Sequence, residues 1–271
     1  MARAAFQGEP GAFSEDAILS FFKYIETVPC LSYRDVFEAV VNDVTEFGTI
    51  PVENSQAGSI NEAYDLLLEY PLNIFREIDM RINHYLLALP GDTLSDIKIV
   101  YSHPMAIAQC QDFFNKTKIE VIPDYNTAVS AKRVKEEGVR GRAAIASKRA
   151  AQIYGLDIIA ESIESKVRNY TKFFIISKKV AERAAKNKTS VVFTTKNMTG
   201  ALYSVLGIFA TRNINLTKLE SRPSGNEPWD YAFYLDFQGH IKDKICKEAL
   251  NELKIKTDFL KILGSYPYVE R

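Results

Sequence analysis

The chain has 271 residues, enough for about two domains, and its 46% hydrophobic and 25% charged residues are ordinary for a soluble globular protein. Its 34 basic residues balance 34 acidic ones, so no global charge favours nucleic acid or an anionic membrane as a partner. No apolar run approaches the roughly 20 residues of a membrane span. The N-terminus leads into a predicted strand without a signal-peptide core, so we expect a cytoplasmic protein.

The first 160 residues alternate short apolar runs with helical patterns, which is typical of an α/β sheet with mostly parallel strands. The first block is predicted to contain strand 3–7, helix 14–23, strand 28–31, helix 34–44, strand 47–52 and helix 59–69. Ser14 is expected at the N-cap of the first helix, because acidic residues follow it in the first turn.

A long extended stretch over residues 73–89 interrupts the alternation, which then restarts. The second block is predicted to contain strand 97–101, helix 104–114, strand 119–122, helix 127–137, strand 143–146 and helix 148–154. A second extended stretch follows over residues 158–176. Two α/β blocks joined by two extended segments predict two lobes with a cleft between them, and small ligands favour such clefts.

Residues 178–188 are charged and poorly periodic, as expected of a linker. The remaining pattern predicts strand 190–195, helix 201–212, strand 216–222, strand 231–238, helix 242–253 and strand 259–266. This βαββαβ order is ferredoxin-like.

Cysteines and histidines offer no ligand spacing. There are three of each, scattered along the chain: Cys30, Cys110, Cys246, His84, His103 and His240. We therefore expect no disulfide framework, no zinc site and no Ser-His-Asp triad.

Polar motifs recur where predicted strands end and helices begin, which is the usual ligand position in α/β sheets. In chain order they are Gly8-Glu-Pro-Gly-Ala-Phe-Ser14, Ile50-Pro-Val-Glu-Asn-Ser55 with Gly58, Tyr101-Ser-His-Pro104 with Gln109-Cys110, Asn126-Thr-Ala-Val-Ser130 and Asn169-Tyr-Thr-Lys-Phe173. Helix capping alone explains any one of them. Several helix N-termini converging on one cleft would form an anion site.

This series, in this order, resembles the prephenate dehydratase family, and residues 189–271 resemble the ACT regulatory domain that follows the catalytic unit in that family. The resemblance implies an α/β fold with a two-lobed, periplasmic-binding-protein-like (type 2) catalytic unit over residues 1–184. Lobe one would comprise residues 1–78 and 159–184, and lobe two residues 79–158. A ferredoxin-like βαββαβ ACT domain would follow over residues 189–271.

The resemblance also implies the chemistry. Prephenate carries two carboxylates, and the family expels its ring hydroxyl as water and its ring carboxylate as carbon dioxide, which leaves phenylpyruvate. No metal and no cofactor are expected. Thr171 matches the family's catalytic threonine and would donate a hydrogen bond to the leaving oxygen. The matching substrate-binding positions are Asn54, Ser55, Ser102, Gln109, Thr127, Asn169, Lys172 and Phe173.

Two positions depart from the family pattern. Lys172 stands where the family usually has arginine, so a planar two-pronged carboxylate contact is lost, and either Lys172 or Arg168 would supply the charge. Ala12 stands where a threonine is usual, which removes a hydroxyl from the expected pocket.

The C-terminal resemblance implies feedback regulation by L-phenylalanine. The matching effector positions are Gly200, Ala201, Leu202, Asn213, Leu216, Glu220, Ser221, Arg222 and Pro223. Because ACT domains characteristically pair side by side, a homodimer or homotetramer is expected.

Two other functions stay open. Arogenate dehydratase catalyses the same elimination on the transaminated substrate, and the motifs do not distinguish the two substrates. A non-catalytic two-lobed sensor linked to an ACT domain is the alternative from another class. Retention of Thr171 argues against it.

Overall fold

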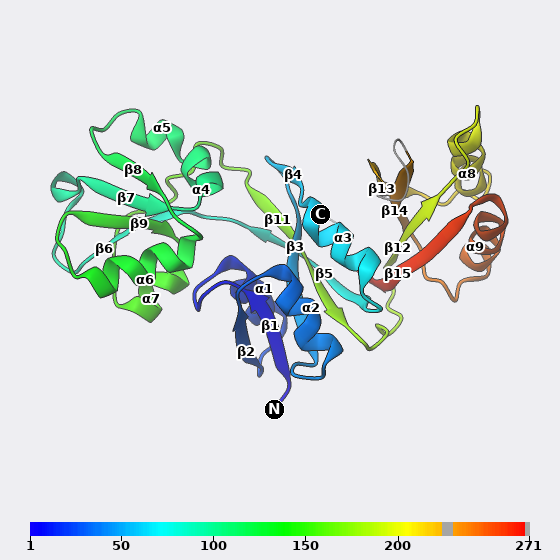
Figure 1. Ribbon diagram of the computed structural model, residues 1–271, viewed down its shortest axis with the longest axis horizontal. Coiled ribbons are helices and arrows are strands. Elements are labelled where there is room, and N and C mark those ends of the chain that lie inside the picture. Colours follow the sequence, from blue (N-terminus) through cyan, green and yellow to red (C-terminus); the bar gives the residue numbers. More distant parts are fainter. Residues whose placement is uncertain (224–229, 269–271) are drawn as a thin grey trace. The chain divides into compact units, whose positions relative to one another are not determined.

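The computed structural model describes residues 1–223 and 230–268 (Figure 1). The chain divides into two compact units, of which the first comprises Met1–Ala63 and Ile78–Phe173 and the second Tyr64–Glu77 and Phe174–Arg271. Among the described residues, no helix is long and apolar enough to cross a membrane.

The first sheet has six strands in the order β2-β1-β3-β11-β5, with β4 beside β3. Its strands are β1 (Arg3–Gln7), β2 (Glu26–Cys30), β3 (Phe47–Asn54), β4 (Gly58–Ser59), β5 (Asn73–Arg81) and β11 (Tyr170–Ser177). The helices between these strands along the chain are α1 (Phe13–Phe21), α2 (Tyr33–Val41) and α3 (Asn61–Glu69). β1 pairs in parallel with both β2 and β3, as the alternating pattern predicted.

The starts of α1 and α2 are capped differently. Ser32 and Asp35 form a reciprocal capping box at α2, in which the Asp35 N–H donates to Ser32 Oγ and the Ser32 N–H donates to Asp35. The predicted Ser14 cap is wrong, because α1 begins at Phe13 and Ser14 is buried in its first turn. The N-cap is Ala12, which has no side-chain cap, and the Glu15 carboxylate instead accepts the N–H of Gly11, just before the helix, at 2.7 Å.

The second sheet has five strands in the order β10-β6-β9-β7-β8. Its elements are β6 (Tyr85–Ala88), a 3-10 turn at Leu94–Asp96, β7 (Ile99–Ser102), α4 (Pro104–Gln109), α5 (Gln111–Phe114), β8 (Glu120–Pro123), α6 (Thr127–Glu137), β9 (Arg142–Ala146), α7 (Lys148–Tyr154) and β10 (Asp157–Ala160). The single helix predicted over residues 104–114 is interrupted at Cys110.

Strand alternation in this sheet produces two apolar faces. Leu86 and Ile145 pack with the residues of α4 and α5, whereas Leu87 and Ala144 pack with those of α6 and α7. Figure 1 shows these two helix pairs on opposite sides of the sheet. With two α/β lobes and a ferredoxin-like C-terminal region, the predicted fold class is confirmed.

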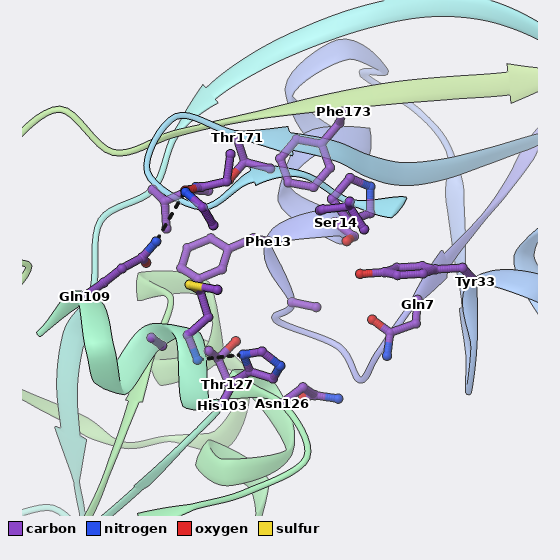
Figure 2. Close-up of a pocket in the computed structure, with 18 of the residues that line it drawn as sticks. Gln7, Phe13, Ser14, Tyr33, His103, Gln109, Asn126, Thr127, Thr171 and Phe173 are labelled. Atoms are coloured by element: carbon purple, nitrogen blue, oxygen red, sulfur yellow. Dashed lines mark hydrogen bonds between the residues drawn. The ribbon is translucent and has the colours of Figure 1, made fainter. Parts of the chain in front are cut away.

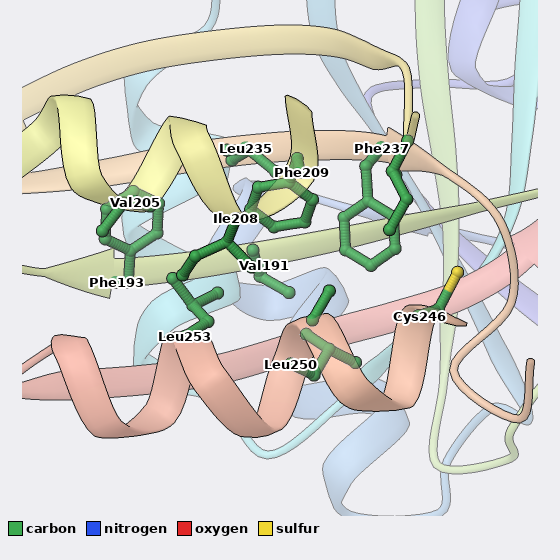
Figure 3. Close-up of a cluster of buried hydrophobic side chains, with 12 residues drawn as sticks. Val191, Phe193, Val205, Ile208, Phe209, Leu235, Phe237, Cys246, Leu250 and Leu253 are labelled. Atoms are coloured by element: carbon green, nitrogen blue, oxygen red, sulfur yellow. The ribbon is translucent and has the colours of Figure 1, made fainter. Parts of the chain in front are cut away.

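The C-terminal region forms a four-stranded antiparallel sheet in the order β13-β14-β12-β15. Its elements are β12 (Asn187–Thr194), α8 (Ala201–Ala210), β13 (Leu216–Pro223), β14 (Tyr231–Gln238), α9 (Lys244–Lys256) and β15 (Phe259–Pro267). One sheet face packs under the two helices, with Phe193, Phe209 and Phe237 among the fully buried side chains (Figure 3).

The opposite face of this sheet makes polar contacts with residues 64–77 of the same unit. Tyr234 donates its hydroxyl to the Tyr64 carbonyl at 3.1 Å. Lys188 forms a buried ion pair with Glu77, and both carboxylate oxygens lie 2.8 Å from its Nζ. The Lys261 ammonium donates to the carbonyls of residues 67, 68 and 70, at the C-terminal end of α3.

Candidate active site

A cavity of about 600 Å³ lies in the first unit, lined by residues of both of its lobes (Figure 2). Residues from α1, α2, α4 and α6 reach it, together with residues from β3 and β11. Contacts between the lobes hold its walls together. Tyr125 donates its hydroxyl to the Leu31 carbonyl at 2.9 Å, and Ser147 donates to the Gly11 carbonyl at 2.7 Å.

Three helices of nine or more residues have their N-cap residue in the wall of the cavity. Their N-cap residues are Ala12, Ser32 and Asn126, all of which line it. Helix N-termini carry unpaired backbone N–H groups and partial positive charge, so together they favour an anion. The Asn126 side-chain oxygen accepts the Val129 N–H, while its Nδ2 is buried and has no hydrogen-bond partner within the described chain.

Charged side chains are scarce in this cavity. Among the described lining residues there is no lysine or arginine, and Glu62 carries the one carboxylate. Burial, and then the Glu62 carboxylate, raise the pKa of the lining residue Tyr33 to about 12. Tyr33 therefore keeps its proton at neutral pH and offers another hydrogen-bond donor.

Thr171 lies where β11 meets the cavity, and Asn54 determines the direction of its hydroxyl. The Asn54 side-chain oxygen accepts the backbone N–H groups of Gln56 and Ala57, at 2.9 and 3.1 Å. Its Nδ2 is thereby turned toward Thr171 Oγ1, at 2.9 Å. Because Thr171 accepts this hydrogen bond, its own hydroxyl hydrogen stays available to a ligand.

Two further amides extend this arrangement. Asn54 Nδ2 also lies 2.9 Å from the Asn169 side-chain oxygen. Asn169 in turn donates to Gln109 Oε1 at 2.9 Å, and Gln109 Nε2 lies 3.4 Å from the Asn54 oxygen. Gln109 lines the cavity, as does Phe173 (Figure 2). The network thus surrounds Thr171 with groups whose donors and acceptors are matched.

The structure brings five of the residues predicted for catalysis and substrate binding together around the cavity: Asn54, Gln109, Thr127, Thr171 and Phe173. Three others act behind them. Asn169 is fully buried in the amide network, Ser55 exchanges hydrogen bonds with the backbone of residues 168 and 170, and Ser102 donates to the Ile145 carbonyl.

Lys172, the remaining predicted residue, does not line the cavity and faces away from it. Successive side chains of a strand point to opposite faces. Thr171 and Phe173 share the cavity side of β11, so Lys172 faces the other way, where its Nζ lies 3.3 Å from Glu53 Oε2. Arg168, the other candidate cation, does not line the cavity either.

Several lining residues were not selected from the sequence: Gln7, Phe13, Tyr33, Glu62, His84 and His103 among them. His103 stands inside a quoted motif and caps α4 by accepting the Met105 N–H. Tyr33 directly follows the Ser32 cap, so the predicted start of that helix could have indicated that Tyr33 lies at the cavity. His84 gave no signal in the sequence, because its partners are distant in the chain.

The predicted effector residues lie at the start of α8 and along β13, except Asn213, which lies in the connection between them. Gly200 is the N-cap of α8 with φ +80°, a conformation that favours glycine. Arg222 donates to Asp65 at 2.9 Å, while its Nε and Nη1 are buried and have no hydrogen-bond partner within the described chain. These free donors are suited to a ligand carboxylate.

A cavity with a directed hydroxyl, matched amides and helix N-termini is the site of an enzyme that acts on a small anion. The prephenate dehydratase family model matches residues 4–181, and the ACT domain model matches residues 189–254. The chain belongs to the prephenate dehydratase family and carries a C-terminal ACT domain. It is a dehydratase of the phenylalanine-forming branch of metabolism.

Two of three similar proteins carry dehydratase names, and the third is titled as an acylase. "Arogenate dehydratase/prephenate dehydratase 1, chloroplastic" of Arabidopsis thaliana is 41% identical over 98% of this chain and 72% of its own length. A prephenate dehydratase from Arthrobacter aurescens, solved in complex with L-Phe, is 31% identical with a TM-score of 0.91, covering 98% of this chain and 90% of that one. A structure titled as a quorum quenching acylase, GqqA, is 33% identical with a TM-score of 0.91 and 98% coverage of both chains.

Proposed function

We propose that this protein converts prephenate to phenylpyruvate, with Thr171 as the catalytic donor. The observation that carries the proposal is the hydrogen bond from Asn54 Nδ2 to Thr171 Oγ1. It directs the threonine hydrogen toward a cavity in which helix N-termini and polar side chains replace cationic side chains as the anion-binding groups.

In this reaction the ring C–O bond breaks as the bond to the ring carboxylate breaks. The electron pair released with carbon dioxide completes the aromatic ring, and the departing hydroxyl takes up one proton and leaves as water. Thr171 stabilises the developing charge on that oxygen by hydrogen bonding. Asn54, Gln109, Thr127 and Asn169 hold the substrate or hold the groups that contact it.

L-Phenylalanine is the proposed effector, bound by the residues around Gly200 and by β13. Arg222, with two free buried donors, is suited to its carboxylate. The protein is proposed to be a cytoplasmic homodimer or homotetramer assembled through ACT domains. The proposed catalytic domain spans residues 1–184 and the proposed ACT domain residues 189–271.

Glu62 favours a second candidate substrate. Arogenate carries an ammonium group where prephenate carries a keto oxygen, and Glu62 provides the one carboxylate among the described lining residues. Both reactions would use the same elimination at Thr171. Replacing Glu62 by glutamine should lower arogenate turnover relative to prephenate turnover by about 10- to 100-fold if the carboxylate binds the ammonium, the loss expected of one charge-assisted hydrogen bond.

The experiment compares kcat/KM on prephenate with kcat/KM on arogenate, for the wild type and for Glu62→Gln. Product formation is measured in each case. Titration with L-phenylalanine and light scattering test the effector and the assembly. An N-acyl amide serves as the third substrate, because of the structure titled as an acylase. Absence of turnover on both prephenate and arogenate would refute the proposal. Hydrolysis of the amide alone would show that the protein is an acylase instead.

A further inference from the structure

His84 is a buried histidine at the end of the amide network, on the connection between β5 and β6. It is 2% exposed and lines the cavity. Its Nε2 lies 2.8 Å from Gln109 Oε1. The ring of Phe13 lies against the imidazole edge to face, with centroids 5.7 Å apart. The backbone is held on both sides, since the His84 N–H donates to Glu164 and its carbonyl accepts the Ile163 N–H.

The protonation of His84 follows from the direction of the hydrogen bonds that reach it. A backbone N–H can only donate a hydrogen bond, so the N–H groups of residues 56 and 57 must face the side-chain oxygen of Asn54 and thereby fix its orientation. Asn54 then presents Nδ2 to the Asn169 oxygen, and Asn169 presents its own Nδ2 to Gln109 Oε1. An amide oxygen carries no hydrogen, so the His84 nitrogen facing it must be the donor.

His84 therefore carries a hydrogen on Nε2, and two observations favour the neutral ring. Its Nδ1 is buried and has no hydrogen-bond partner within the described chain. Burial lowers the pKa of His84, and the Gln109 hydrogen bond and the Glu164 charge oppose that effect only in part. A neutral ring with a permanent donor at Nε2 is suited to holding a partner in place rather than to exchanging protons.

The group that it holds is the Gln109 amide. Two donors, from His84 and Asn169, converge on Gln109 Oε1. They turn Gln109 Nε2 toward the region of Asn54 and Thr171, where it makes one long contact of 3.4 Å and keeps a second hydrogen for a ligand. We propose that His84 is a positioning residue for the dehydration, acting through Gln109 to aim an amide donor at the substrate.

This inference rests on the proposed function, and its test uses the full-length protein without phenylalanine. His84→Gln keeps an N–H donor at about the position of Nε2, whereas His84→Leu fills similar space without one. We expect His84→Leu to lower kcat about 10- to 100-fold, as misplacement of one reacting contact does, and His84→Gln to stay within about threefold of wild type. Equal losses in the two variants would overturn the proposal.

Two further measurements exclude a merely structural role. If His84 acts through Gln109, then adding His84→Leu to Gln109→Leu should cause no further loss of kcat, whereas additive losses would overturn the proposal. His84→Gln should also keep the pH profile of the wild type, because it removes a titratable ring that does not exchange protons. His240, which is 1% exposed in the C-terminal region, provides the matched control: His240→Leu should leave kcat unchanged.

A spectroscopic measurement separates this inference from the proposed reaction. In full-length protein labelled with ¹⁵N-histidine, the His84 signals are those missing from His84→Gln. We expect a neutral ring protonated at Nε2 at neutral pH and above. A ring protonated at Nδ1, or a charged ring, would refute the hydrogen-bond directions even if the wild type turned out to act on another substrate.

Discussion

Replacing Thr171 by valine removes the one hydroxyl that the proposed mechanism requires and changes little else. Valine keeps the volume and the β-branch that suit β11. Asn54 Nδ2 has two hydrogens and lies within hydrogen-bond distance of three acceptors, namely Thr171 Oγ1, the Asn169 oxygen and the Tyr170 carbonyl. Loss of the threonine oxygen therefore leaves no orphaned donor.

The expected magnitudes differ sharply for folding and for catalysis. Stability should fall by no more than about 1 kcal/mol, the net contribution of one hydrogen bond. Loss of one transition-state donor typically lowers kcat by about 10²- to 10³-fold, or about 3–4 kcal/mol. Thr171→Ser retains a hydroxyl and should remain within about tenfold of wild type, which makes it the matched control.

The assay is phenylpyruvate formation at saturating prephenate, together with thermal unfolding of the same preparations. A Thr171→Val protein with wild-type stability and near-normal kcat would remove the hydroxyl from the mechanism. A large loss of stability would instead show that the contact between Asn54 and Thr171 supports the fold. It would contradict the expectation that the remaining two acceptors satisfy Asn54 Nδ2.

Other variants test features away from the catalytic hydroxyl. Lys172→Met should change KM for prephenate less than about twofold, because Lys172 pairs with Glu53 and faces away from the cavity. A tenfold rise in KM would show that Lys172 binds the substrate. Lys188→Met should destabilise the protein by about 3–5 kcal/mol in urea unfolding, because the buried Glu77 carboxylate loses the ammonium of this ion pair, and adding Glu77→Gln should restore part of the loss. Burial raises the folded-state pKa of Asp16 to about 7, above its ordinary 3.8. The contribution of Asp16 to the free energy of unfolding is therefore most favourable below pH 4 and is lost as the pH rises to 7. Asp16→Asn has no such carboxyl, so its free energy of unfolding should fall less than that of the wild type between pH 5 and pH 8.

The order of elements was predictable because each is built by local patterns. The alternation of apolar strands and amphipathic helices gives the same chain order in the structure, and helices α6 and α7 have the predicted bounds. Contacts between distant residues were not predictable. Ser14 fits the composition of a cap, but the helix begins one residue earlier, and Glu15 holds the preceding turn through the Gly11 N–H.

The candidate site shows the same division. Resemblance selected Thr171 and its amide neighbours, and the structure places them around one cavity. The direction of Lys172 was available from strand alternation, since a cavity that includes Thr171 and Phe173 requires the residue between them to face away. His84 was beyond reach, because Gln109 stands 25 positions later and nothing local joins the two.

The contact between Lys261 and the end of α3 has a consequence for synthesis of the chain. The three carbonyls that accept its ammonium hydrogens lie 191 to 194 residues earlier in the chain. During translation, α3 leaves the ribosome before β15 exists, so the last turn of this helix lacks its donor until 191 further residues have been added. A nascent chain cut before β15 carries these carbonyls without their donor, and contacts of such long sequence separation form late and slowly. β15 thus completes the hydrogen bonding of a helix that is synthesised much earlier.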